Sequence, residues 1–292
     1  MSRPPSFTPP PGARAYSLRT ARGEFAVVDS PVADGVVPKG TALLLPGFTG
    51  SKEDFNPLQE TLSARGYRTV AVDGRGQYES DGPRDDESAY AQAELAQDAL
   101  AQAAALGTPV HLVGHSLGGQ IARAAVLLDR APFLSLTLMA SGPAQISVSQ
   151  QQRVKLLRDA LAVMSMAEVW EAIQAMEPPE ETDTGDLDAG LDDQDDLRRR
   201  WLGNKPAQLI ATGLQLCVEP DRVADLAAVA LPFHVLSGSR DDTWAVPLLD
   251  DMALRLRAHR TVVQGAEHSP NTDNPLDTAR AFADFWDRSQ SR

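Results

Sequence analysis

The segment Gly114-His115-Ser116-Leu117-Gly118 constrains the fold of this chain more than any other, because of what flanks it. Residues 110–113 before it form an apolar run typical of a buried strand, and residues 119–128 after it have the pattern of a helix. A strand that turns this sharply into a helix strains the turn residue. The glycines two positions before and after it let the two backbone segments approach closely, because they carry no Cβ atom that would collide. We therefore predict that the Ser116 hydroxyl stands at the edge of a sheet, beside the positive end of a helix.

Strand and helix signals alternate along most of the chain. The predicted strands are a hairpin at 15–19 and 24–28, followed by 41–45, 69–72, 110–113, 134–139, 233–236 and 260–263. The predicted helices of this part are 55–65, 88–106, 119–128, 247–258 and 275–288. This alternation predicts an α/β fold with a mostly parallel central sheet and helices on both of its faces.

The alternation breaks after the sixth strand, where about ninety residues precede the next one. A βαβ crossover needs only about 30 residues. We therefore predict a helical cap, or lid, at 145–227 over the carboxyl edge of the sheet, with helical patterns at 151–175 and 207–216. Residues 177–196 between them carry ten carboxylates and no base, so we expect an acidic solvated loop. A calcium site there is a second interpretation, although the spacing matches no EF-hand.

The predicted domain organisation is a flexible proline-rich leader at 1–14, a core formed by 15–144 and 228–292, and the cap between its two parts. The net charge of −13 disfavours nucleic acid and anionic membrane surfaces as partners. One cysteine, Cys217, allows no disulfide within the chain. No segment suits secretion or a membrane span, so we expect a cytoplasmic protein with a small-molecule substrate. The oligomeric state stays open.

A serine hydroxyl needs a base to become a nucleophile, and the base needs an acid to orient it. His268 lies in the loop that leaves the last predicted strand, and such loops gather at the carboxyl edge of a parallel sheet. We predict His268 as the base. Packing or solvation suits the other histidines better: His111, His115, His234 and His259.

Two neighbouring carboxylates, Asp241 and Asp242, follow the strand at 233–236 and could orient His268. We favour Asp241 as the acid of the triad and keep Asp242 as the alternative.

The order serine, aspartate, histidine resembles that of the α/β-hydrolase fold superfamily. Residues 114–119 are similar to its nucleophile elbow, and 46–50 resemble its oxyanion loop. The resemblance implies that the backbone N–H groups of Phe48 and Leu117 form the oxyanion hole. Residues 73–80 resemble a structural turn of the superfamily, Asp-x-Arg-Gly-x-Gly-x-Ser.

Two residues depart from the superfamily pattern. Pro46 stands where the oxyanion loop commonly has histidine, which changes the stiffness of the loop but not its donors. Tyr78 replaces a glycine, and its ring is a candidate for the substrate pocket. Trp170 in the cap and Trp244 beside the acid loop are further pocket candidates.

The resemblance implies a serine hydrolase that cleaves an ester, thioester or related acyl bond of a small, partly apolar substrate. Serine at the elbow argues against the branches that use a carboxylate nucleophile. We expect no cofactor and no metal, since one cysteine leaves no Cys-x-x-Cys pair and no dinucleotide fingerprint follows a suitable strand. The alternatives are carbon–carbon bond hydrolysis, acyl transfer on the same triad, and a non-catalytic ligand-binding member of the fold.

Overall fold

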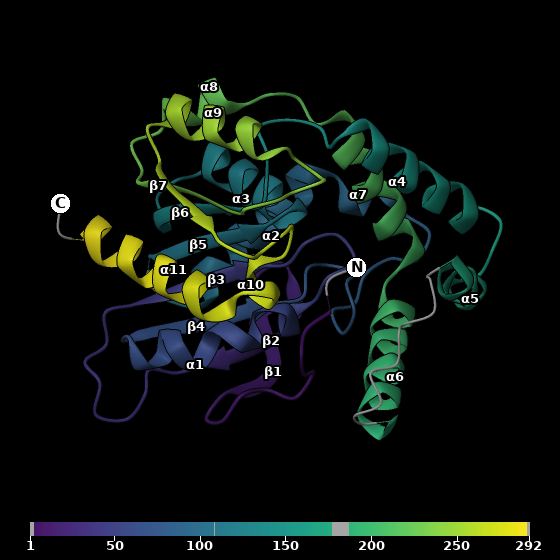
Figure 1. Cartoon of the computed structure of the whole chain (residues 1–292), viewed down its shortest axis with the longest axis horizontal. Helices are drawn as coiled ribbons and strands as arrows, with labels where there is room; N and C mark the ends of the chain where they lie inside the picture. The colour runs from purple at the N-terminus through teal and green to yellow at the C-terminus, as the bar shows by residue number, and fades with distance from the viewer. Residues whose placement is uncertain (1–2, 108, 177–186, 291–292) are drawn as a thin grey trace.

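An eight-stranded sheet forms the centre of the molecule in the computed structural model, which describes residues 3–107, 109–176 and 187–290 (Figure 1). The strands are β1 (Arg14–Thr20), β2 (Gly23–Ser30), β3 (Gly40–Leu45), β4 (Tyr67–Val72), β5 (Val110–His115), β6 (Phe133–Met139), β7 (Phe233–Gly238) and β8 (His259–Val263). Their order across the sheet is β1-β2-β4-β3-β5-β6-β7-β8. The pairs β1–β2 and β2–β4 are antiparallel and the others are parallel, so the predicted α/β class is confirmed.

Helices cover both faces of the sheet. One face carries α1 (Asn56–Ala64) and α11 (Pro275–Gln290), with the short α10 (Pro270–Asp273) beside them. The other carries α2 (Gln92–Ala105), α3 (Leu117–Leu128), α8 (Val223–Ala227) and α9 (Val246–Leu256). Two 3-10 helices, η1 (Lys52–Phe55) and η2 (Glu87–Tyr90), precede α1 and α2. No helix in the described part of the chain combines the length and the apolar character needed to cross a bilayer.

An apolar core lies on each face of the sheet, because successive side chains along a strand point to opposite faces. In β3, Leu43 and Leu45 point into the core beneath α2 and α3, whereas Ala42 and Leu44 point into the core beneath α1 and α11. Parallel strands that are covered on both faces need apolar residues at successive positions, which explains the continuous apolar runs in the sequence.

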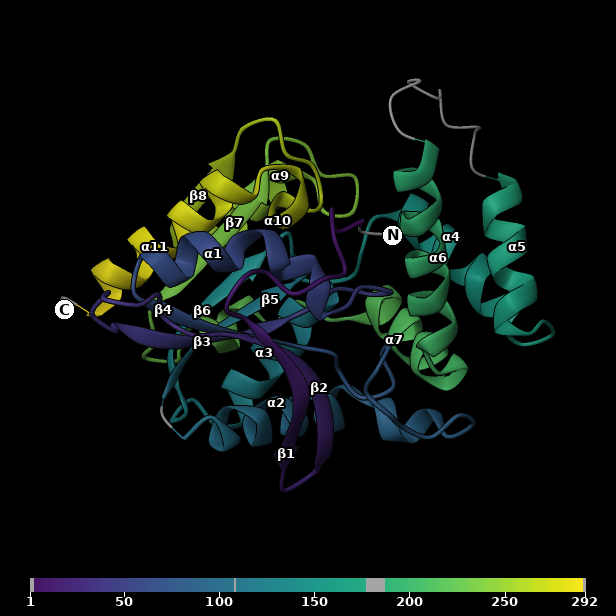
Figure 2. The ribbon, with the colours of Figure 1, turned by 90° about the horizontal axis from the view of Figure 1, so that it is seen from below.

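In the described part of the chain between β6 and β7, four of the five helices gather at one end of the molecule, and the fifth, α8, packs on the sheet (Figure 2). The four are α4 (Val148–Leu161), α5 (Met166–Met176), α6 (Leu187–Gly203) and α7 (Pro206–Val218). We call residues 145–227 the insertion. The insertion has an apolar cluster of its own, made by Leu161, Met166, Val169, Trp170, Leu197, Trp201 and Leu209.

The insertion corrects two expectations. The predicted helix at 151–175 is broken, because Ser165 and Glu168 exchange hydrogen bonds in a capping box that begins α5. The predicted acidic loop at 177–196 is wrong from residue 187 onward, where α6 begins; residues 177–186 lie outside the described part of the chain. Leu197 and Trp201 lie one turn apart on α6 and are buried, so packing of this face outweighs the weak helix preference of the acidic sequence.

The segment predicted as a leader contacts the core and the insertion around residues 6–8. The Asn56 side chain donates hydrogen bonds to the carbonyl oxygens of Ser6 and Thr8 at 3.3 and 3.2 Å. The Phe7 ring contacts the Tyr78 ring edge-on, with 6.4 Å between centroids, and lies 5.5 Å from Cζ of Arg200. The segment therefore joins the core to the insertion.

Two buried histidines lie in the strands beneath α11. The His111 ring of β5 stacks on Trp286 with centroids 5.0 Å apart, and its Nδ1 is 2.8 Å from Ser135 Oγ. Burial lowers the pKa of His111 to about 3 and the pKa of His234 in β7 well below its usual value. Both rings are therefore neutral near pH 7.

We predict that the free energy of unfolding falls as the pH drops below about 6.5, the usual pKa of histidine, because the unfolded chain then binds protons that the folded chain rejects. His111→Gln keeps hydrogen-bonding groups but does not titrate. Its loss of unfolding free energy between pH 7.5 and 5 should be smaller than that of the wild type by about 2 kcal/mol. Urea unfolding at both pH values measures this difference, and equal losses in the two proteins would contradict the prediction.

Candidate active site

Ser116 occupies a strained turn between β5 and α3, with φ 54° and ψ −118°. Two glycines make this turn possible. A Cβ on Gly114 would lie 2.3 Å from the carbonyl oxygen of Gly118, and a Cβ on Gly118 would lie 2.4 Å from that of Leu45. The start of α3 therefore rests directly on the backbone at the end of β3. The Ser116 N–H also donates to the carbonyl of Met139 at 2.9 Å, which ties the turn to β6.

The structure brings Ser116, His268 and Asp241 into one chain of hydrogen bonds. Ser116 Oγ lies 3.1 Å from His268 Nε2, and His268 Nδ1 lies 3.0 and 3.1 Å from the two carboxylate oxygens of Asp241. The backbone N–H groups of Thr243 and Trp244 donate to Asp241 Oδ1 at 2.8 and 3.1 Å. The Asp241 carboxylate is fully buried, so its partners hold it in one orientation.

Asp242 lies elsewhere. Its carboxylate accepts a hydrogen bond of 2.6 Å from Gln150 Nε2 and lies 3.6 Å from Arg153, and its side chain is 65% exposed. The structure therefore brings Asp241, rather than the alternative Asp242, to His268.

The two expected oxyanion donors lie on the two segments that meet at Ser116. Leu117 is the first residue of α3, and the N–H groups of a first helical turn have no partner within the helix. Phe48 follows Gly47, where a Cβ would lie 3.2 Å from the Ser116 Cβ. The Gly47 carbonyl accepts from Gln77 Nε2 at 3.0 Å and from the Gly50 N–H at 3.1 Å. We call residues 46–51 the oxyanion loop, after the stretch 46–50 that resembles this loop of the superfamily and the adjoining Ser51.

His115 supports the backbone at His268. Its Nε2 lies 2.9 Å from the carbonyl oxygen of His268 and donates to it, which holds the backbone of the histidine loop. Burial, followed by the nearby His268, lowers the pKa of His115 to about 4. The ring is therefore neutral near pH 7, and its proton is on Nε2.

Ser116 and His268 open into a cavity of about 350 Å³ between the core loops and the insertion. The apolar residues of its wall are Phe48, Ile146, Val154 and Leu216. The charged and amide residues of its wall are Gln150, Arg153, Asp242, Glu267 and Asp273. The insertion thus contributes to the cavity through residues of α4 and α7 that were not among the predicted pocket residues.

The three predicted pocket residues do not line this cavity. Tyr78 has a φ of 38°, and its ring covers the Lys52 ammonium at 4.7 Å while its hydroxyl accepts from Arg199 Nε at 3.1 Å. Trp170 is buried in the apolar cluster of the insertion. Trp244 is buried behind His268, with ring centroids 6.1 Å apart.

Sequence reasoning missed several residues that hold the site. Gln77 supports the oxyanion loop, and the buried residues Asp54, Arg200 and Asn271 form contacts around it. The charged run at 52–54 and the arginine run at 198–200 were the available signals. Neither run reveals that its charges are buried, because the partners lie 146 residues apart.

No group of three or more His, Cys, Asp or Glu side chains is placed to hold a metal ion within residues 3–107, 109–176 and 187–290. His111 and His115 are four residues apart, but they lie on a strand, where that spacing separates Cα atoms by about 13 Å. They therefore cannot bind one ion together.

A family model described as the alpha/beta hydrolase family matches residues 42–281. The chain belongs to this family. The predicted membership of the α/β-hydrolase enzymes is thereby confirmed.

Two named relatives and one solved structure are similar to this chain. A pimeloyl-(acyl-carrier protein) methyl ester esterase of Aeromonas hydrophila is 30% identical over 249 residues, 80% of this chain and 90% of that protein. A Variovorax paradoxus protein named as a carbamate hydrolase is 37% identical over 102 residues, which are 34% of this chain and 38% of that protein. The structure of a thermophilic esterase from Thermogutta terrifontis matches with a TM-score of 0.73 at 20% identity. The match covers 95% of this chain and 99% of the esterase chain, and it shows that the two share a fold.

The strained backbone at Ser116 predicts how substitutions there change the free energy of unfolding. Ser116→Gly and Ser116→Ala both lack the hydroxyl and differ only in the Cβ. Glycine normally costs about 0.5–1 kcal/mol relative to alanine, whereas strain at such a backbone position costs about 1–3 kcal/mol. We expect Ser116→Gly to exceed Ser116→Ala in unfolding free energy by about 1 kcal/mol, measured by urea denaturation. A less stable glycine variant would show that the turn is not strained.

Proposed function

We propose that this chain is a serine hydrolase that cleaves an ester, thioester or related acyl bond through an acyl-enzyme. One observation carries the proposal: the hydrogen-bond chain Ser116–His268–Asp241 ends in a cavity large enough for a small substrate. A serine, an imidazole and a buried carboxylate in this sequence of contacts are the groups that nucleophilic acyl transfer requires.

In the proposed reaction, Ser116 Oγ attacks the acyl carbon while His268 Nε2 accepts its proton. Asp241 keeps the proton on Nδ1 of His268 and stabilises the imidazolium that forms. The backbone N–H groups of Phe48 and Leu117 donate to the developing oxyanion, and one such donor contributes about 3 kcal/mol of transition-state stabilisation. The imidazolium then protonates the leaving group. Water, deprotonated by His268, finally releases the acid from Ser116.

The cavity wall favours a small acyl group with an apolar part. Phe48, Val154 and Leu216 provide apolar wall, and the charged residues Arg153, Asp242 and Glu267 line the same cavity. An ester substrate also agrees with the name of the Aeromonas hydrolase, a methyl ester esterase. We place ester and thioester cleavage ahead of acyl transfer and carbon–carbon hydrolysis on that basis.

A fluorophosphonate probe tests the proposed nucleophile. We expect the folded wild-type protein to be labelled at Ser116, as located by peptide mass spectrometry, and to lose ester hydrolysis in proportion. Ser116→Ala should not be labelled and should lose at least about 10³-fold in kcat. A folded wild-type protein that resists the probe would overturn the acyl-enzyme.

Neighbouring carboxylates supply the matched controls for this experiment. Asp241→Asn should lower kcat by roughly 10³–10⁴-fold, because an amide favours the wrong tautomer of His268. Asp242→Asn removes the carboxylate next in sequence, which lies in the cavity wall but is bound by Gln150 rather than His268; it can change KM but should change kcat by less than about threefold. Equal losses in the two variants would reject Asp241 as the orienting acid.

The apolar wall predicts a dependence on acyl chain length. Each buried methylene contributes about 0.8 kcal/mol, so kcat/KM for p-nitrophenyl esters should rise up to about fourfold per added carbon from acetate to butyrate. Val154→Trp fills the wall and should reduce the butyrate rate more than the acetate rate. Leu156→Trp, on the exposed side of the same helix, is the control and should leave the ratio unchanged. A butyrate-to-acetate ratio that Val154→Trp does not lower would contradict this acyl site.

A further inference from the structure

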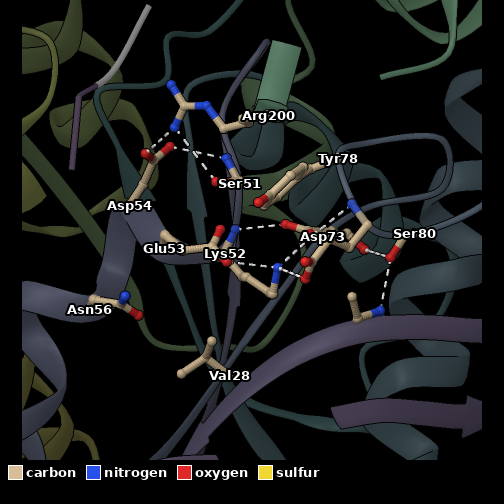
Figure 3. A network of polar contacts seen from close by, with 12 residues as sticks. Val28, Ser51, Lys52, Glu53, Asp54, Asn56, Asp73, Tyr78, Ser80 and Arg200 are labelled. Atoms are coloured by element: carbon tan, nitrogen blue, oxygen red, sulfur yellow. Dashed lines mark hydrogen bonds and ion pairs between the residues drawn. The ribbon is translucent and has the colours of Figure 1, made fainter. Parts of the chain in front are cut away.

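A fully buried ion pair joins the insertion to the core beside the oxyanion loop. Arg200 of α6 donates from Nη1 to Asp54 Oδ1 of η1 at 2.9 Å, and both side chains have no exposed surface (Figure 3). The Phe7 ring contacts the guanidinium from the N-terminal segment. A charge buried this deeply requires its partner, so α6 and η1 must keep their relative position.

The Asp54 carboxylate also holds the oxyanion loop. Its Oδ2 accepts a hydrogen bond of 3.2 Å from the backbone N–H of Ser51. Gly50 lies so close that a Cβ there would be 2.5 Å from the same oxygen, and the Gly50 N–H donates to the Gly47 carbonyl. The carboxylate that binds Arg200 therefore rests directly on the turn that carries the Phe48 N–H.

The backbone of Asp54 holds α10, the short helix that begins two residues after His268. Its carbonyl oxygen accepts a hydrogen bond of 2.7 Å from Asn271 Nδ2, and Asn271 is buried three residues after His268. Three segments thus meet at Asp54: α6 of the insertion, the oxyanion loop and the segment that positions His268.

We propose that Arg200 is a positioning residue for the reaction, which couples docking of α6 to the geometry of the oxyanion loop and of His268. The inference rests on the proposed function. Arg200 does not line the cavity, so it acts through Asp54 rather than on the substrate. A misplaced oxyanion donor raises the barrier of the chemical step while it leaves substrate binding largely unchanged.

Arg200→Met tests the proposal, since it keeps the length of the side chain without its charge. For a short ester we expect kcat to fall about 10–100-fold and KM to change less than about threefold. The rate of fluorophosphonate labelling should fall with kcat. Amide hydrogen exchange should rise in both 46–51 and 264–271. Arg200→Lys keeps a charge that reaches Asp54 and should recover part of the lost kcat.

Arg123→Met is the matched control. Arg123 forms another buried ion pair between the core and the insertion, with Glu219 at 2.7 Å, but its contacts do not include the oxyanion loop. Arg123→Met should lower the thermal midpoint as Arg200→Met does, while its kcat stays within about threefold of the wild type. If the two variants lose the same thermal midpoint and also the same kcat, Arg200 has only a structural role and the proposal is overturned.

The remaining outcomes are also decisive. If Arg200→Met does not fold, Arg200→Lys decides: a kcat below the wild type by threefold or more supports the proposal, and a wild-type kcat overturns it. If the wild-type protein neither hydrolyses esters nor reacts with the probe, the proposed function fails. The hydrogen-exchange comparison then still tests the coupling, since unchanged exchange at 46–51 and 264–271 in Arg200→Met would reject it.

Discussion

The close contact of backbones at Ser116 is the constraint on which the site depends. The glycines at 114 and 118 let the start of α3 lie on the carbonyl groups at the end of β3, where any side chain would collide. That contact brings the first N–H of α3 and the oxyanion loop to the same side of Ser116. The distance between Ser116 Oγ and His268 Nε2 is then set by the loops that follow β7 and β8, which carry Asp241 and His268.

The core could be predicted from the sequence because its information is local. Apolar runs at 41–45 and 110–113 belong to strands covered on both faces, and each lies within the observed β3 and β5. The loop at 264–270 also had to face the carboxyl edge, since it leaves a parallel strand. Ser116 and His268 were therefore identifiable without any knowledge of packing.

The choice between Asp241 and Asp242 could not be made in this way. A sequence pattern does not distinguish two adjacent aspartates in a loop. Their side chains point in different directions because of the turn that follows. The Thr243 and Trp244 N–H groups bind the Asp241 carboxylate and direct it inward, while Gln150 of the distant α4 binds Asp242. The acidic start of α6 was missed for a similar reason, because its helix is stabilised by Leu197 and Trp201 packing on other helices of the insertion.

Charges buried at the boundary between core and insertion serve a different purpose from the apolar clusters. A buried ion pair contributes little net free energy of folding, but a misaligned one leaves an unpaired charge at a cost of several kcal/mol. Arg200–Asp54 and Arg123–Glu219 are both of this kind, and each joins the core to the insertion. Apolar surfaces tolerate small shifts, whereas these two pairs do not. We infer that Arg200–Asp54 fixes where α6 lies on the core and that Arg123–Glu219 fixes the end of α7, whereas only Asp54 also contacts residues 46–51.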